Sequence, residues 1–167
     1  RRCRGNYQQF LPKITQVVGA LQFAPDDSMV ATYSWASKAQ VWNPLTRENL
    51  ATWDKISSFG GFAADGAYLL LGGVDGALLL CEPKTGGTKR VVKDAGQLVA
   101  FAPGAGLAAT VSSNEVLRVL DLATSQVRFS VTNVSRRKLD FGWGDRVNMS
   151  PNGKILAVIE PTQEVLR

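Results

Sequence analysis

The stretch LQFAPDD at residues 21–27 returns as GFAADG at residues 61–66, as AFAPGAG at residues 100–106 and as NMSPNG at residues 148–153. Each copy places a large apolar residue before a small residue and a turn, and an apolar run follows. Proline restricts the backbone at such a turn, and aspartate side chains accept hydrogen bonds from nearby backbone amides. The chain therefore repeats one unit, in which a short strand leads through a tight turn into a second strand.

The copies are spaced at a regular period. Phe62 follows Phe23 by 39 residues, Phe101 follows Phe62 by 39, and Met149 follows Phe101 by 48. Two further markers keep step, 19 and 23 residues after each phenylalanine: Trp42, Cys81 and Leu120, and then Thr46, Thr85 and Thr124. Self-similarity at about 40 residues indicates a repeat architecture.

One repeat contains four short strands separated by turn residues. In the first copy, residues 19–23, 29–34, 39–42 and 49–53 are mainly apolar, β-branched or aromatic, with polar turns between them. No segment has the sustained 3.6-residue period of a helix. Four antiparallel strands in every repeat predict an all-β protein built from the blades of a β-propeller.

The second strand of each later repeat is apolar without alternation, as in residues 67–71, 107–111 and 155–159. Strands that are covered on both faces have this pattern, and each blade of a propeller is covered by its two neighbours. We therefore expect the repeat markers to occupy equivalent buried sites, with residues of the second strands buried beside them. The expected core residues are Phe23, Phe62, Phe101, Met149, Leu69, Leu70, Leu156 and Val158.

The repeats resemble those of the WD40 family, in which an apolar strand enters a Phe-Ser-Pro-Asp-Gly-like turn and a later strand ends in Trp-Asp. Residues 23–27, 62–66 and 149–153 match the turn, while Trp42-Asn43 and Leu120-Asp121 each keep half of the Trp-Asp pair. The family often has a Gly-His pair before the first strand, but this chain contains no histidine. The resemblance is therefore to degenerate repeats, and it implies a scaffold that docks other proteins on its rim and faces.

The repeats predict a single WD40-like propeller segment over residues 1–167. Because the chain is predicted to start inside one blade and to end inside another, either the N-terminal strand completes the last blade and closes a ring of four or the chain belongs to a larger propeller. We favour the larger propeller. The predicted repeats are 15–53, 54–92, 93–132 and 145–167, with an outer strand of a preceding or closing blade at 7–14 and an insertion at 132–144.

The composition is that of a globular protein, with 45% apolar and 20% charged residues. No apolar run approaches the 18 residues of a transmembrane helix, and no signal-peptide pattern opens the chain. Cys3 and Cys81 lie far apart, as is typical of reduced thiols in an intracellular protein. These features favour an intracellular, cytoplasmic location without a membrane partner.

The sequence contains no constellation that indicates catalysis. The absence of histidine removes the most common general base and most zinc sites. The glycine-rich residues 72–76 lie between two predicted strands, whereas a phosphate-binding loop must lead into a helix. We therefore predict that the chain is not an enzyme and has no cofactor, metal ion or small-molecule substrate.

Two classes of function remain. The first is a non-catalytic scaffold for other proteins of a multisubunit complex; the second is the propeller domain of an RNA-associated machine or of a larger enzyme. The net charge is +5, and a basic cluster in the insertion has the charge to contact RNA or an acidic partner. Tryptophan, tyrosine and arginine are enriched at interface hot spots. The candidate partner-binding residues are Tyr33, Trp35, Arg136, Arg137 and Lys138. The alternatives are that Trp35 packs against the next blade and that the insertion is an ordinary solvated loop.

Overall fold

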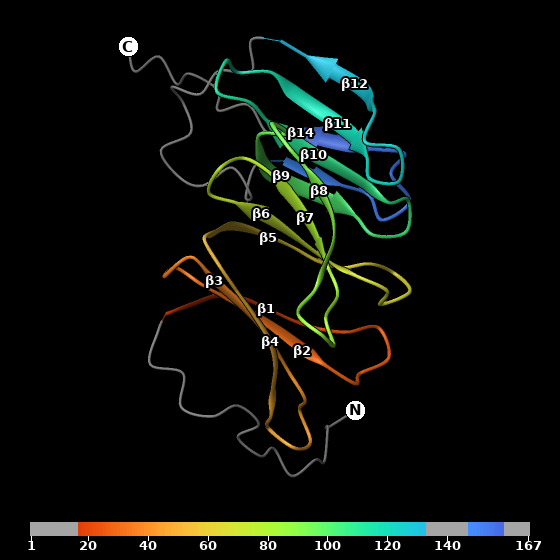
Figure 1. Cartoon of the computed structure of the whole chain (residues 1–167). Coiled ribbons are helices and arrows are strands. Elements are labelled where there is room, and N and C mark those ends of the chain that lie inside the picture. The colour runs from red at the N-terminus through yellow and green to blue at the C-terminus, as the bar shows by residue number, and fades with distance from the viewer. Residues whose placement is uncertain (1–16, 133–146, 159–167) are drawn as a thin grey trace, which may run out of the picture.

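The computed structural model describes residues 17–132 and 147–158, and these residues form antiparallel sheets without helices (Figure 1). Three sheets have four strands each, in sequence order, and a fourth has two. The first sheet contains β1 (Val18–Phe23), β2 (Val30–Ser34), β3 (Lys38–Trp42) and β4 (Asn49–Asp54). The second contains β5 (Ile56–Phe62), β6 (Leu69–Gly73), β7 (Leu78–Cys81) and β8 (Thr88–Val92). The third contains β9 (Gln97–Ala102), β10 (Leu107–Val111), β11 (Leu117–Asp121) and β12 (Val127–Val131), and the fourth β13 (Val147–Met149) and β14 (Leu156–Val158).

The turns between strands form as their residue types dictate. Asn43 Oδ1 accepts hydrogen bonds from the backbone amides of Leu45 and Thr46, at 2.9 and 3.1 Å. Asp121 makes the same two bonds to Ala123 and Thr124 in the corresponding turn of the third sheet. These side chains replace backbone partners that a tight turn lacks, which is why asparagine and aspartate favour such positions.

The sheets stack face to face, and an apolar cluster lies in each of the three interfaces. Figure 1 shows the first sheet at one end, followed by the second and the third. Phe62, Leu69 and Leu71 of the second sheet pack against the first, whereas Leu70 and Leu78 pack against the third. Alternate residues of one strand thus face opposite neighbours, which explains the unbroken apolar runs in the sequence.

Most, but not all, of the predicted core is buried. Phe62, Met149, Leu69 and Leu70 are buried as predicted, while Phe101 and Leu156 are half-buried. The prediction was wrong for two residues, Phe23 and Val158, which are exposed.

Both exceptions have the same physical origin. Phe62 and Met149 point toward the preceding sheet, but no described sheet precedes β1, so Phe23 has 48% of its surface exposed. Val158 lies on β14, which has one hydrogen-bonded neighbour among the described strands. The markers are equivalent in the repeat, but their burial differs because their neighbours differ.

The residues 19 positions after each marker are buried in all three four-stranded sheets. Trp42 donates a hydrogen bond from Nε1 to Oγ1 of Thr32, at 3.2 Å. Cys81 and Leu120 occupy the same position in the second and third sheets and are also buried. Burial raises the pKa of the Cys81 thiol to about 12, so this cysteine behaves as a small apolar side chain.

The first and second sheets are also joined by a polar contact between their innermost strands. Gln22 of β1 accepts a hydrogen bond at its Oε1 from the backbone amide of Phe62 in β5, at 2.9 Å. Gly61 makes room for this contact, because a Cβ there would lie 2.3 Å from the same oxygen. The backbone of Gly61 has φ of +107°, which only glycine adopts readily.

Within the described ranges, the chain contains no helix capable of spanning a membrane. The predicted outer strand at 7–14 and most of the predicted insertion at 132–144 lie outside the described residues.

Candidate protein-binding groove

Tyr33 and Trp35, two of the predicted partner-binding residues, lie at one end of the first sheet. Tyr33 is in β2 and Trp35 is in the turn that leads to β3. The Trp35 backbone amide donates to the carbonyl of Val17, and the indole lies over Gly19, where a Cβ would be 3.0 Å from Nε1. The Trp35 side chain is nevertheless exposed, with 72% of the residue's surface open to solvent. Trp35 is therefore held by its own sheet and does not pack into the next one.

Tyr33 connects this tryptophan to the second sheet. Its hydroxyl donates to the carbonyl of Ser57 at 3.0 Å, and its ring stacks on Phe59 of β5 with centroids 6.5 Å apart. The Trp35 ring is tilted against Tyr33 at a centroid distance of 6.4 Å. Partial burial raises the pKa of the Tyr33 phenol. The three rings form an aromatic cluster whose inner members are fixed and whose outermost member, Trp35, is open to solvent.

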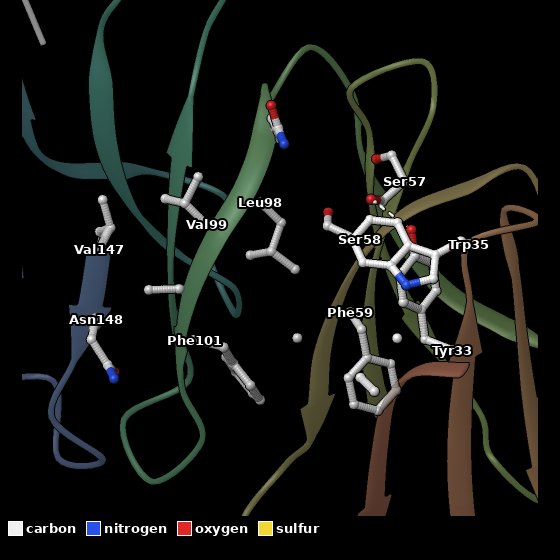
Figure 2. A pocket seen from close by; sticks show the side chains of 15 residues that line it. Tyr33, Trp35, Ser57, Ser58, Phe59, Leu98, Val99, Phe101, Val147 and Asn148 are labelled. Atoms are coloured by element: carbon white, nitrogen blue, oxygen red, sulfur yellow. Dashed lines mark hydrogen bonds between the residues drawn. The ribbon is translucent and has the colours of Figure 1, made fainter. Parts of the chain in front are cut away.

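A groove of about 420 Å³ begins at the aromatic cluster and crosses the innermost strands of all four sheets. Figure 2 shows the three rings on one side of it, Leu98, Val99 and Phe101 in the middle, and Val147 and Asn148 on the far side. None of the described residues that line the groove has a charged side chain. Its lining residues are Gly19, Ala20, Tyr33, Trp35, Ser57, Ser58, Phe59, Gly60, Gln97, Leu98, Val99, Ala100, Phe101, Val147 and Asn148.

The polar groups of the groove are hydroxyls and amides. The Ser57 hydroxyl is in hydrogen-bond contact with the carbonyls of Gly72 and Gly73, at 3.2 and 2.9 Å. The Ser58 hydroxyl is buried and has no hydrogen-bond partner among the described residues. Gln97 and Asn148 contribute side-chain amides. Hydroxyls and amides bind neutral polar groups such as peptide bonds, and the apolar residues between them suit uncharged side chains.

Comparison with solved structures identifies the architecture. The structure of U3-55K superposes with a TM-score of 0.59 at 17% sequence identity, covering 74% of this chain and 41% of that one. The crystal structure of RRP9 WD40 repeats gives the same score and coverage at 16% identity. The sheets are blades of a WD40-like β-propeller. No protein-family model and no curated protein sequence matches the chain. The part of this chain that superposes on these two solved structures covers less than half the length of either one.

The WD40-like propeller architecture accounts for the position of the groove. The first strand of each sheet is the innermost strand of a blade, and β1, β5, β9 and β13 lie next to one another in that order. The groove therefore lies on the inner surface of the propeller, and Trp35 stands at one rim of that surface. Each sheet presents its residues to the groove from a rigid strand and not from a long loop.

Two further pockets lie at the opposite rims of the propeller. One, of about 540 Å³, shares Ser57 and Gln97 with the groove and contains Asp75 and Asp94. The other, of about 290 Å³, is at the far rim and contains Asp26, Asp65, Glu82 and Lys84. Within the described residues, no group of three histidine, cysteine, aspartate or glutamate side chains is arranged to hold a metal ion.

The remaining predicted site residues, Arg136, Arg137 and Lys138, lie outside the described residues. Sequence reasoning also missed most of the groove. Phe59 and Leu98 lie three residues before the markers Phe62 and Phe101, and this shared repeat position was the available signal. Asn148 precedes its marker by one residue, as Gln22 does in the first repeat.

Proposed function

We propose that this chain is a non-catalytic interaction module that holds another protein of a multisubunit assembly in the groove beside Trp35. The observation that carries this proposal is the exposed indole at the end of a groove whose described lining residues are uncharged. A tryptophan that is largely exposed but fixed against Tyr33 and Gly19 loses little conformational freedom on binding. Aromatic side chains that become buried on binding contribute most of the energy of many protein interfaces.

The chemistry of the groove supports binding rather than turnover. Its described lining offers hydroxyls, amides and aromatic rings, and the phenol of Tyr33 is the one ionisable side chain among these described residues. That phenol has a raised pKa and already donates to Ser57. General acid–base catalysis needs a group that titrates near the working pH, and Tyr33 does not meet this requirement.

The experiment is capture of partners from cell extract with the wild-type chain and two matched variants. Trp35→Ala removes the exposed indole, whereas Leu45→Ala removes a more exposed apolar side chain from a turn at the opposite rim. We expect Trp35→Ala to lose the partner and Leu45→Ala to keep it. The free energy of unfolding, measured by thermal melts, should change by less than about 1 kcal/mol for either variant, since both side chains are on the surface. If Trp35→Ala keeps every partner captured by the wild type, the groove is not the interface.

A second candidate function is contact with RNA through the basic cluster at residues 136–138. The specific observation is that the segment containing this cluster continues into Val147, which lines the groove. Changing Arg136, Arg137 and Lys138 together to serine tests this function. Loss of binding to a single-stranded RNA, with a salt-dependent affinity in the wild type, supports an RNA contact. Retained RNA binding in the triple variant contradicts it.

A further inference from the structure

The turn between β13 and β14 contains the sequence Asn152-Gly153. Asn152 is the one asparagine of the 167-residue sequence that a glycine follows. Glycine has no side chain to hinder its own backbone nitrogen, so this nitrogen can attack the carboxamide carbon of the preceding asparagine. The attack closes a cyclic imide and releases ammonia. The sequence therefore contains one asparagine that is chemically predisposed to deamidation.

The folded turn holds both reacting groups. The Gly153 amide donates a hydrogen bond to the carbonyl of Ser150 at 2.8 Å. The carboxamide oxygen of Asn152 accepts hydrogen bonds from the backbone amide of Lys154, at 3.1 Å, and from the Ser150 hydroxyl, at 2.8 Å. The Gly153 nitrogen must lose its proton to attack, and the hydrogen bond retains that proton. The closed turn therefore slows the reaction, although Asn152 is exposed.

The Ser150 hydroxyl stabilises this turn from its side chain. Besides donating to Asn152, it accepts a hydrogen bond from the backbone amide of Ile155 at 2.9 Å. The turn also contacts the third sheet, where the Gly104 amide donates to the carbonyl of Pro151 at 3.0 Å. Opening the turn breaks these bonds together, so the open turn is a minor state of the folded chain.

The corresponding turns of the first and second sheets show that a carboxylate fits the position of Asn152. Asp26 and Asp65 occupy the same repeat position. Asp26 accepts a hydrogen bond from the backbone amide of Ser28 at 3.1 Å. Asp65 accepts the equivalent bond from Ala67 at 3.0 Å. Deamidation of Asn152 to aspartate therefore preserves the turn and adds one negative charge, whereas isoaspartate inserts a methylene into the main chain and changes the turn.

We propose that Asn152 is a modification site, which is deamidated spontaneously when the β13–β14 turn opens, and that the turn accepts the aspartate product. The Gly153 nitrogen forms a bond to Cγ of Asn152, the carboxamide C–N bond breaks, and ammonia leaves with the proton of the Gly153 nitrogen. Water then adds to either carbonyl of the imide and gives aspartate or isoaspartate. The rate follows the fraction of time for which the turn is open. This modification does not depend on the groove beside Trp35.

Mass spectrometry of the 167-residue chain, incubated at neutral pH and digested with trypsin, measures the rate. The tryptic peptide of residues 147–154 contains Asn152 and also Asn148, which methionine follows and which serves as an internal control. A blocked synthetic peptide of the same residues gives the rate without the folded turn. We expect Asn152 to deamidate at least about tenfold more slowly in the folded chain than in the peptide, and Asn148 to remain unchanged over the same period.

Two variants test whether the turn controls the rate. Ser150→Ala removes the two hydrogen bonds of the hydroxyl, and it should raise the rate in the folded chain about threefold without changing the rate in the peptide. Ser28→Ala is the matched control, because it removes a hydroxyl that donates to Asp26 in the turn of the first sheet. It should leave the rate at Asn152 unchanged. Circular dichroism shows whether both variants are folded.

Asn152→Asp tests whether the turn accepts the product. We expect the Gly153 amide to be as protected from hydrogen exchange in this variant as in the wild type. Loss of that protection would show that the turn rejects aspartate and would overturn this part of the proposal. Equal rates of deamidation in the folded chain and the peptide, or an unchanged rate in Ser150→Ala, would overturn the control by the turn. Absence of deamidation in the peptide would overturn the modification site itself.

Discussion

The innermost strands β1 and β5 occupy the same position in their sheets, and their markers Phe23 and Phe62 are the same residue type. Phe62 is 2% exposed, between the first and second sheets, whereas Phe23 is 48% exposed. The difference lies in the neighbouring sheet and not in the local sequence. Repetition in a sequence thus predicts which residues are equivalent, but the burial of each depends on its place in the stack.

The largest expected effect comes from truncating these two markers. Phe62→Ala should lower the free energy of unfolding by about 3–5 kcal/mol, because it opens a cavity in a closed interface. Phe23→Ala should lower it by less than about 1 kcal/mol, since much of the ring is already in water. Urea unfolding of both variants measures the two values. Equal losses in the free energy of unfolding would show that Phe23 is as buried as Phe62 in solution.

A smaller effect tests the contact that joins β1 to β5. Gly61→Ala should cost about 1–3 kcal/mol, because alanine is strained at φ of +107° and its Cβ would overlap Gln22 Oε1. The cost should fall in a Gln22→Ala background, where the overlap is removed and the backbone strain is not. Urea unfolding of the four proteins in this double-mutant cycle separates the two contributions. Full additivity would rule out a coupling between Gln22 and Gly61.

The turns after the third strands of the first two sheets have different residues at one left-handed position. The effect of that residue on stability can be measured. Arg47 and Gly86 occupy the same repeat position, and both have a left-handed backbone, with φ of 64° and 76°. Gly86→Ala should cost about 1 kcal/mol, since a Cβ is unfavourable in this region. Arg47→Gly should stabilise the chain by less than about 0.5 kcal/mol, because relief of strain is offset by a more flexible unfolded chain. Thermal melts give both values, and a large loss for Arg47→Gly would contradict the shared geometry.

The smallest effect is expected at the corresponding turn of the third sheet. The hydrogen bond from Arg128 and the turn amides lower the pKa of Asp121 from 3.8 to about 2. Its contribution to stability is therefore complete above about pH 4 and is lost as the pH falls toward 2. Asp121→Asn should be slightly less stable than the wild type at pH 7 and equal to it near pH 2. Carbon NMR of the Asp121 carboxyl checks the pKa, and a midpoint near 4 would exclude the ion pair in solution.

Much of the fold follows from the sequence because it depends on local chemistry. Phe62, Phe101 and Met149 mark the ends of innermost strands, and Asn43 and Asp121 form the turns that their side chains favour. These features are set within one repeat. The exposure of Phe23 and Val158 depends on which sheets are adjacent in space, and periodicity alone contains no such information.

The candidate site was less predictable for a related reason. Trp35 was identified from its residue type and its place beside a turn, and the structure shows that Tyr33 lies against it. The groove itself combines residues from β1, β5, β9 and β13, which are separated by whole repeats in sequence. Phe59, Leu98 and Asn148 become neighbours only when the sheets stack, so no single segment shows the groove.

Among the described residues, the apolar clusters join each sheet to the sheet before or after it, so local opening of the backbone should be graded along the stack. The second sheet is held on both faces, and its strand β6 is buried along its whole length. Its amides should therefore exchange with solvent at rates close to those of global unfolding. The amides of β12, whose side chains are all exposed, should exchange through frequent fraying that leaves β6 intact. A stack of this kind can open at one end while its middle remains folded.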